Sequence, residues 1–177
     1  VIMFSFSRKN CERYAQLINI SLVDHEEISE IEQTFNVLIH NLLGENKNMQ
    51  QILLLKKLLL KGIGIHHSGL HHTLKEIVEN LFERGLIKVL FATETFAVGV
   101  NMPAKTVVFT HLEKYDNNGL RSLFTAEYLQ MSGRAGRRGL DKKGTVIYMP
   151  LFDMLSKHEM IRLVSGKSQK LVSQFLL

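Results

Sequence analysis

The sequence has little that would staple it together or anchor it. It contains one cysteine, two prolines and no tryptophan among its 177 residues. The single thiol, Cys11, cannot form an internal disulfide bridge, and its place in an expected helix is typical of a small core residue. No uninterrupted apolar run approaches the roughly 20 residues that a helix needs to cross a bilayer, and no basic-then-apolar leader precedes the first strand-like segment. We therefore expect a soluble, intracellular α/β domain with no membrane partner.

The charged residues are unevenly distributed. A formal net charge of +5 favours a polyanionic partner such as nucleic acid, although many basic proteins bind none. Acidic side chains gather between Asp24 and Glu32, whereas basic side chains crowd residues 134–143. The basic segment is therefore the first candidate binding site.

Strand-like and helix-like patterns alternate along residues 1–150. The opening VIMFSF is strand-like, and apolar residues between Cys11 and Ile18 recur at the spacing of a helix packed on a sheet. Further strands are expected in GIGIHH, IKVLFAT and KTVVFTH, together with a helix that ends at Gly85 and a final helix-then-strand pair over residues 125–149. This alternation predicts a mostly parallel sheet between helical layers.

Two segments fall outside the alternation. Residues 24–61 are rich in Leu and Ile and predict two helical stretches around Gly44, which we interpret as a helical insertion. Residues 151–177 are expected to hold a helix over 153–164 and an extended exit toward a following domain. Because the sequence opens inside a strand and without an initiator methionine, we expect it to be a piece of a longer protein.

The expected sheet indicates where ligands should bind. In open parallel sheets, ligands lie beyond the carboxyl ends of the strands. The loops after Phe6, Ile65, Ala92 and Phe109 are therefore the candidate binding loops.

The sharpest local signal is QMSGRAGRRG at residues 130–139. Arg134 and Arg137 are three residues apart, so on a helix they would share one face and could both reach a multiply charged phosphate with their planar forks. The glycines of this segment would let the backbone approach a ligand closely. The alternative is a solvated basic turn, which the interleaving of glycine and arginine after Gln130 disfavours.

This segment resembles motif VI of superfamily 2 helicases, in the form found in the superkiller and exosome-associated DExH RNA helicases. FATETFAVGVNMPAKTVVF at 91–109 resembles their motif V, and IMFSFSRKNCERYA at 2–15 resembles their motif IV. The stretch from GIGIHHSGL to LFATE is similar as well, so the resemblance covers nearly the whole chain. It implies a RecA-like three-layer sandwich that forms the second motor lobe of an ATP-dependent helicase.

The resemblance also implies residues that face the nucleotide. In the resembling helicases, the glutamine and arginines of motif VI face the γ-phosphate of ATP bound on the other lobe, which implies Gln130, Arg134 and Arg137, with Arg137 as the arginine-finger candidate. Gly99 and Asn101 of motif V would approach the ribose. ATP and Mg²⁺ would be held mainly by lobe 1, because this sequence contains neither a phosphate loop nor the acidic residues that bind magnesium.

A second implied set of residues lines a channel over single-stranded RNA. Its members are Ser5, Ser7, Arg8, His67, Ser68, Gly69 and Thr93. Glu94 is expected to couple the RNA and ATP sites, and strand-end capping is the alternative role for Ser5 and Ser7. Contacts to phosphate and sugar carry no sequence information, so RNA binding should depend on salt and be nearly independent of sequence.

Two further patterns imitate binding sites. The histidines of HHSGLHH suggest zinc, but no carboxylate or thiolate is close in sequence to complete a site, so we expect no metal centre. His71 and His72 stand where the resembling helicases usually have Leu-Pro, which removes a rigid helix start. SGKS at 165–168 lacks the glycine that a phosphate loop needs at the position of Ile161, and it follows a helix instead of a strand.

The expected function is that of the second lobe of an RNA helicase that moves 3′ to 5′ in exosome-linked RNA decay. GLDKKGTVIYM at 139–149 and LVSGKSQKLVSQF at 163–175 favour the cytoplasmic superkiller branch, with exosome, tetratricopeptide and WD-repeat partners, over the nuclear exosome-adaptor branch. The alternatives are a lobe of a related DNA repair helicase and a non-catalytic docking module. The isolated chain is expected neither to hydrolyse ATP nor to bind it tightly.

Overall fold

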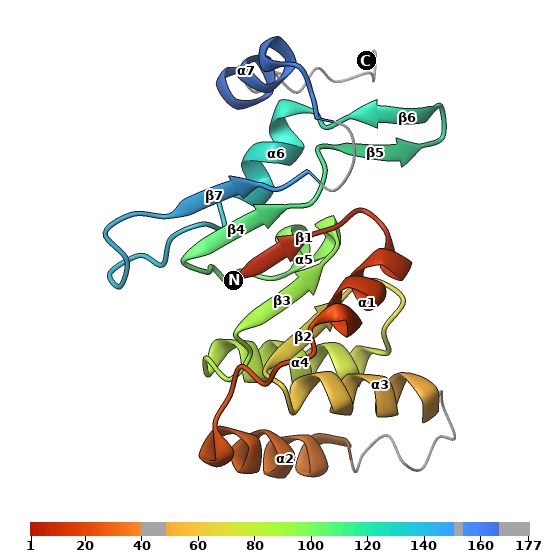
Figure 1. Cartoon of the computed structure of the whole chain (residues 1–177), viewed down its shortest axis with the longest axis vertical. Helices are drawn as coiled ribbons and strands as arrows, with labels where there is room; N and C mark the ends of the chain where they lie inside the picture. Colours follow the sequence, from red (N-terminus) through yellow and green to blue (C-terminus); the bar gives the residue numbers. More distant parts are fainter. Residues whose placement is uncertain (40–48, 151–153, 167–177) are drawn as a thin grey trace, which may run out of the picture.

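A five-stranded parallel sheet forms the centre of the protein (Figure 1). The computed structural model describes residues 1–39, 49–150 and 154–166. In spatial order, the strands are β2 (Ile63–His66), β3 (Val89–Ala92), β1 (Ile2–Phe4), β4 (Thr106–Phe109) and β7 (Thr145–Tyr148). Each neighbouring pair is parallel. The sheet predicted from the alternating pattern is confirmed.

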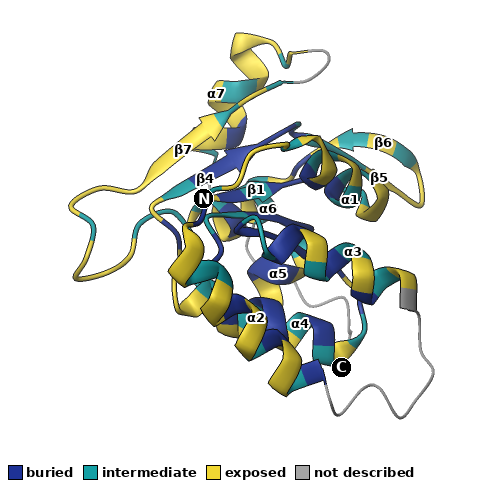
Figure 2. Cartoon of the chain, turned by 60° about the horizontal axis from the view of Figure 1, so that its bottom comes forward, coloured by how far each residue is buried: buried dark blue, intermediate teal, exposed yellow. Residues whose placement is uncertain are grey.

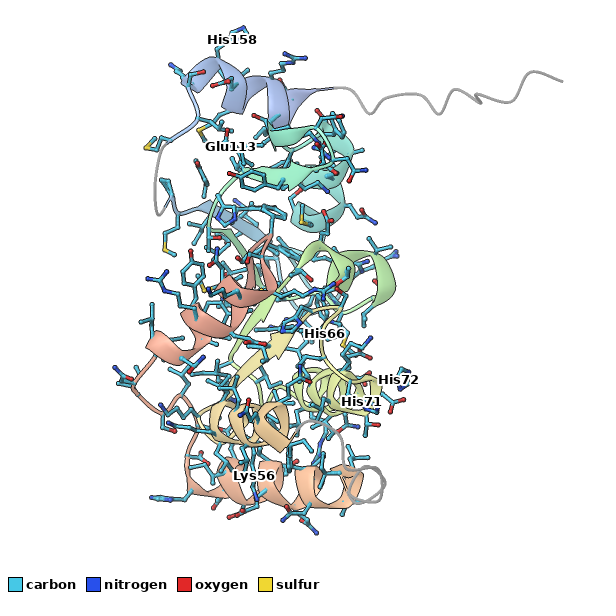
Figure 3. All side chains as sticks on the ribbon, turned by 90° about the vertical axis from the view of Figure 1, so that its right-hand side faces the viewer. Lys56, His66, His71, His72, Glu113 and His158 are labelled. Atoms are coloured by element: carbon cyan, nitrogen blue, oxygen red, sulfur yellow. The ribbon has the colours of Figure 1, made fainter. Side chains whose placement is uncertain are left out.

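Helices cover both faces of this sheet. In Figures 1 and 3, α1 (Arg8–Leu17) and α3 (Met49–Leu59) lie on one face, and α4 (His72–Glu83), α5 (Glu94–Gly99) and α6 (Thr125–Ser132) lie on the other. The result is a three-layer α/β sandwich of RecA-like form, as expected.

The two helices expected as an insertion have different places in this sandwich. The first, α2 (His25–Ile39), packs against α4 and lies outside the layers. The second, α3, packs against β2 and belongs to one of the layers. The turn expected at Gly44 lies outside the described residues.

Burial falls from one side of the sheet to the other. Every residue of β2 is buried, and β4 is buried after its first residue. Such strands need apolar side chains on both faces, which is why they appear in the sequence as continuous apolar runs. By contrast, Val146 and Ile147 of the edge strand β7 are exposed, and Figure 2 shows β7 in yellow beside the darker β4.

Two elements beyond the sheet complete the described structure. A hairpin of β5 (Glu113–Asp116) and β6 (Gly119–Ser122) was not predicted, because its residues are largely polar and none of them is buried. The last helix, α7 (Lys157–Ser165), begins with a capping box in which Ser156 Oγ accepts from the Glu159 amide at 3.3 Å. The expected exit segment, residues 167–177, lies outside the described residues. No described helix is both long enough and apolar enough to span a bilayer.

Candidate functional site

The residues expected to contact RNA form one strip at the carboxyl ends of β2, β3 and β1. Because β3 lies between the other two strands, backbone hydrogen bonds connect all three ends. The amide of Ser5 donates to Ala92 O at 2.9 Å, and the amide of Thr93 donates to His66 O at 3.1 Å. The loops predicted from strand order are therefore neighbours in the structure.

The members of this strip differ in exposure. Arg8 and Ser68 are exposed, Ser7 and Gly69 are half-buried, and Ser5, His67 and Thr93 are buried. A methyl group added to Gly69 would lie 3.2 Å from Arg8 Cδ, so the loop after β2 touches the start of α1. Ser7 also caps α1, because its Oγ accepts from the Asn10 amide at 3.3 Å. That bond supports the capping alternative for Ser7.

His67 is held inside the strip. Its side chain is 2% exposed, and its Nδ1 accepts from the Gly69 amide at 3.1 Å. Nε2 lies 3.2 Å from Glu12 Oε1 on α1 without the alignment of a hydrogen bond. Burial lowers the pKa of His67 despite the opposing effect of Glu12, so the ring is neutral at pH 7. His67 therefore shapes the 67–69 loop from within.

The other histidines of this region do not converge. His66 points into the interior, where Nε2 lies 2.7 Å from Glu79 Oε1, whereas His71 and His72 lie at the outer start of α4 (Figure 3). His71 caps that helix by accepting from the Thr73 amide, and His72 pairs with Glu76, so they replace the Leu-Pro start with a different one. Within residues 1–39, 49–150 and 154–166, no three potential ligands form a metal site.

The arginine-rich segment is a turn and not a helix. α6 ends at Ser132, and Gly136 has a φ of 94°, which a helix cannot contain. The backbone instead pairs with the segment before β4, because the Ala104 amide donates to Arg134 O at 2.9 Å and the Gly136 amide donates to Ala104 O at 2.7 Å. The prediction that Arg134 and Arg137 share a helical face is therefore wrong.

Arg134 joins this turn to the residues that follow β3. Its Nη1 donates to Asn101 Oδ1 at 2.7 Å, and its Nη2 donates to the carbonyl of Ala97 on α5. Two of its donors are thus occupied within the domain. Arg134 therefore connects the α5 segment to the turn at residues 133–140, which we call the arginine turn.

Arg137 has a different environment. Its side chain is 45% exposed, and its guanidinium forms a two-pronged ion pair with Asp141, from Nε to Oδ2 at 2.8 Å and from Nη2 to Oδ1 at 3.0 Å. These hydrogen bonds hold the pKa of Asp141 at about 2, so the carboxylate is ionised at physiological pH. Arg137 is therefore fixed within its turn and faces solvent.

A cleft of about 570 Å³ opens beside Arg137. Asn101, Arg138, Lys88 and Lys105 also line it. Lys88 and Lys105 immediately precede β3 and β4, so the cleft lies at the amino ends of the strands, opposite the strip of RNA candidates. The rule that places ligands at the carboxyl ends predicts only one of these two candidate sites.

The remaining nucleotide candidates lie apart from this cleft. Gly99 lines a smaller cleft of about 250 Å³ together with His66 and Ser68, and no atom would come within 4 Å of a methyl group added to it. Gln130 is exposed in the last turn of α6 and lines neither cleft.

A network of ion pairs links Glu94 to α6 through the unpredicted hairpin. Lys114 of β5 is 14% exposed, and its Nζ lies 2.6 Å from Glu94 Oε2 and 2.7 Å from Glu127 Oε1. Arg121 of β6 donates to both oxygens of Glu127, at 2.8 and 2.9 Å, and to Asp116 at 2.7 Å. Glu94, at the start of α5, is thereby connected to the first turn of α6.

Comparison with known proteins identifies the family of the chain. The family described as the helicase conserved C-terminal domain matches residues 35–139. The chain belongs to this helicase family. Over its whole length it is 48% identical to mouse Superkiller complex protein 2, 49% to mouse Exosome RNA helicase MTR4 and 46% to Antiviral helicase SKI2 of Saccharomyces cerevisiae. These relatives identify it as the C-terminal helicase domain of a Ski2-like DExH helicase, which confirms the family resemblance.

The helicase domain corresponds to a small part of these relatives. It spans 14% of the length of mouse Superkiller complex protein 2 and of SKI2, and 17% of mouse MTR4. Two of the relatives carry RNA helicase names, mouse Exosome RNA helicase MTR4 and DExH-box ATP-dependent RNA helicase DExH11 of Arabidopsis thaliana. The identities of the relatives with this chain differ too little to separate the superkiller and exosome-adaptor branches.

The Glu127 ion pairs predict an acid-sensitive step in the stability of the helicase domain. Burial alone would raise the pKa of Glu127, but hydrogen bonds from Arg121 and Lys114 lower it to about 2. A carboxyl group whose pKa is lower in the folded state stabilises the fold fully at pH values above its pKa in the unfolded state, which is near 4.5. This contribution is lost as the pH falls from 4.5 to 2. Because solvent partly screens these ion pairs, we expect about 1–3 kcal/mol from this group at pH 7.

This contribution can be measured by urea unfolding of wild type and Glu127→Gln at pH 7 and pH 3. The variant should be less stable than wild type at pH 7, and somewhat more than half of the difference should vanish at pH 3. Glu26→Gln, which changes an exposed carboxylate on α2, is the control and should have little effect at either pH. A difference that is the same at both pH values would show that ionisation of Glu127 does not stabilise the fold.

Proposed function

We propose that this domain is the second motor lobe of an ATP-dependent RNA helicase that moves 3′ to 5′ in exosome-linked RNA decay. The observation that carries the proposal is the position of Arg137, which is exposed beside a basic cleft on the side of the sheet opposite the RNA candidates. One lobe can then direct an arginine at a phosphate from the amino ends of its strands and contact the RNA backbone at their carboxyl ends. The RNA helicase names of MTR4 and of Arabidopsis DExH11 support the choice of substrate.

In this proposal, the arginine turn completes an ATP site that is built mainly on lobe 1. The guanidinium of Arg137 stabilises negative charge that develops on the transferred phosphoryl group. Asn101 contacts the ribose, held in place by Arg134. Nucleotide contacts of Gly99 and Gln130 stay predictions, because neither residue lines the cleft beside Arg137. The cationic lining of the cleft fits a polyphosphate but not Mg²⁺, so the magnesium ligands belong to lobe 1.

The RNA strip supplies contacts to phosphates and sugars. Arg8 and Ser68 are exposed and contact the backbone through their side chains, whereas Ser5, His67 and Thr93 are buried and set the shape of the strand ends. Glu94, directly after Thr93, couples this strip to α6 through Lys114 and Glu127. Such binding tolerates any sequence and weakens as salt increases.

The nucleic acid preference can be tested on the full-length helicase. We expect single-stranded RNA to stimulate ATP hydrolysis, and DNA of equal length and sequence to stimulate it far less. Stimulation by DNA alone would replace the RNA assignment by that of a repair helicase. Stimulation by neither polymer would favour the non-catalytic docking module.

The isolated domain should be inactive. Because its described acidic residues form no metal site, and no phosphate loop occurs in the sequence, we expect no ATP turnover from the 177-residue chain. ATP hydrolysis by the purified chain would overturn the proposed division of labour between the two lobes.

We place the protein in the cytoplasmic superkiller branch because of the segment 139–149, which resembles that branch. Its partners would then be the exosome and the tetratricopeptide and WD-repeat subunits of a superkiller complex. The other segment that favours this branch, 163–175, lies mostly outside the described residues. Nuclear localisation of the tagged full-length protein would favour the exosome-adaptor branch instead.

A further inference from the structure

Asp141 binds one edge of the Arg137 guanidinium through both of its carboxylate oxygens. Its Oδ2 accepts from the Arg137 Nε at 2.8 Å and from the Arg137 backbone amide at 3.0 Å, while its Oδ1 accepts from Nη2 at 3.0 Å. The Asp141 side chain is 7% exposed, although the Arg137 side chain that it holds is 45% exposed. A nearly buried carboxylate therefore holds a half-exposed arginine.

The turn that carries both residues is closed by its own backbone. The amides of Leu140 and Asp141 donate to Arg137 O at 3.0 and 2.9 Å. Gly139 lies between Arg137 and Asp141 and has a φ of 82°, a backbone conformation that residues other than glycine rarely adopt. The separation of Asp141 from Arg137 is thus set by the fold and not by a flexible side chain alone.

The ion pair leaves the other edge of the guanidinium free. An arginine has five N–H donors, and Asp141 accepts from Nε and from one N–H of Nη2. No described residue accepts a hydrogen bond from Nη1 of Arg137. The outer fork, formed by Nη1 and the second N–H of Nη2, is the edge that binds a phosphate through two parallel hydrogen bonds.

We propose that Asp141 is a positioning residue for ATP hydrolysis, which holds Arg137 so that its outer fork points at the phosphate on lobe 1. This inference rests on the proposed function, in which Arg137 is the arginine finger. A free arginine samples many rotamers, and ordering it only when the phosphate binds would lower the population of the reactive arrangement. Asp141 orders it beforehand without occupying the edge that acts.

A double-mutant cycle on the full-length helicase tests this inference. We expect Asp141→Asn to lower kcat of RNA-stimulated ATP hydrolysis about tenfold and Asp141→Ala somewhat more, with the KM for ATP changed less than about threefold. In an Arg137→Ala background, Asp141→Ala should have almost no further effect, because it acts through the missing guanidinium. A merely structural carboxylate would lower activity in both backgrounds.

The control removes a carboxylate that stabilises structure elsewhere. Asp24 caps α2 by accepting from the Glu27 amide at 2.9 Å, and Asp24→Asn should leave kcat unchanged. If Arg137→Ala leaves turnover intact, the proposed function fails. If Arg137→Ala lowers turnover but Asp141→Ala does not, or lowers it equally in both backgrounds, Asp141 does not position Arg137. A rise in turnover for Asp141→Ala would show instead that Asp141 holds the arginine away from ATP.

Discussion

Replacing Arg137 by alanine in the full-length helicase is expected to lower RNA-stimulated ATP hydrolysis about 10³-fold while RNA binding is retained. The guanidinium acts on charge that develops during phosphoryl transfer, so its loss should reduce kcat. The RNA candidates lie at the other end of the sheet, and the Arg137 side chain is bonded within its own turn, so its removal leaves them in place.

Two quantities are measured on the same preparations of each protein. The first is steady-state ATP hydrolysis at saturating RNA, and the second is RNA affinity without nucleotide. Lys143→Ala is the matched control, because Lys143 is an exposed basic residue of the same loop that does not line the cleft. Equal losses from both variants would point to the overall charge of the loop. Unchanged turnover in Arg137→Ala would make the docking module the better reading.

The sheet could be predicted from the sequence because helices cover both of its faces and bury most of its strand residues. β2, β3 and β4 are short apolar runs, each followed by polar residues at the strand end, and neighbouring parallel strands bring those ends together. The strip of RNA candidates follows from this topology. The topology does not predict whether a polar residue at a strand end faces inward, because that depends on which helix covers the residue. His67, for example, is buried where α1 brings Glu12 to within 3.2 Å of its ring.

The arginine turn and the hairpin show where local patterns fail. A spacing of three residues predicts a shared helical face only if the helix continues, and here Ala104 pairs with the segment instead. That pairing comes from tertiary structure and has no local signal. The hairpin has no apolar face, so no alternation marked it. Lys114 and Arg121 therefore stayed unnoticed although they connect the start of α5 to α6.

Close packing of two backbone segments holds the arginine turn against the start of β7. A methyl group added to Gly144 would lie 2.5 Å from the carbonyl carbon of Ala135 and 2.8 Å from the amide nitrogen of Gly136, and it would overlap the Ala135 oxygen. These are backbone atoms, which cannot rotate away as a side chain can. Only a glycine at position 144 allows the turn to pair with Ala104 as observed.

Gly144→Ala is accordingly expected to destabilise the domain by about 3 kcal/mol, as overpacking of a tight contact does. ATP hydrolysis by the full-length helicase should fall about 10²-fold, because a shift of about 1 Å at residues 135–136 carries Arg137 away from its position. Urea unfolding of the domain and steady-state ATP hydrolysis would measure the two effects separately.

A second glycine variant separates crowding from backbone strain. Gly119, in the hairpin turn, has a φ of 117°, but no atom would come within 4 Å of an added methyl group. Gly119→Ala should therefore cost about 1 kcal/mol of stability through backbone strain alone and leave ATP hydrolysis close to wild type. If Gly144→Ala behaved like Gly119→Ala in both measurements, the contact between residues 135–136 and Gly144 would not be what fixes Arg137. Loss of hydrolysis in Gly144→Ala under conditions in which the protein stays folded would show that it is.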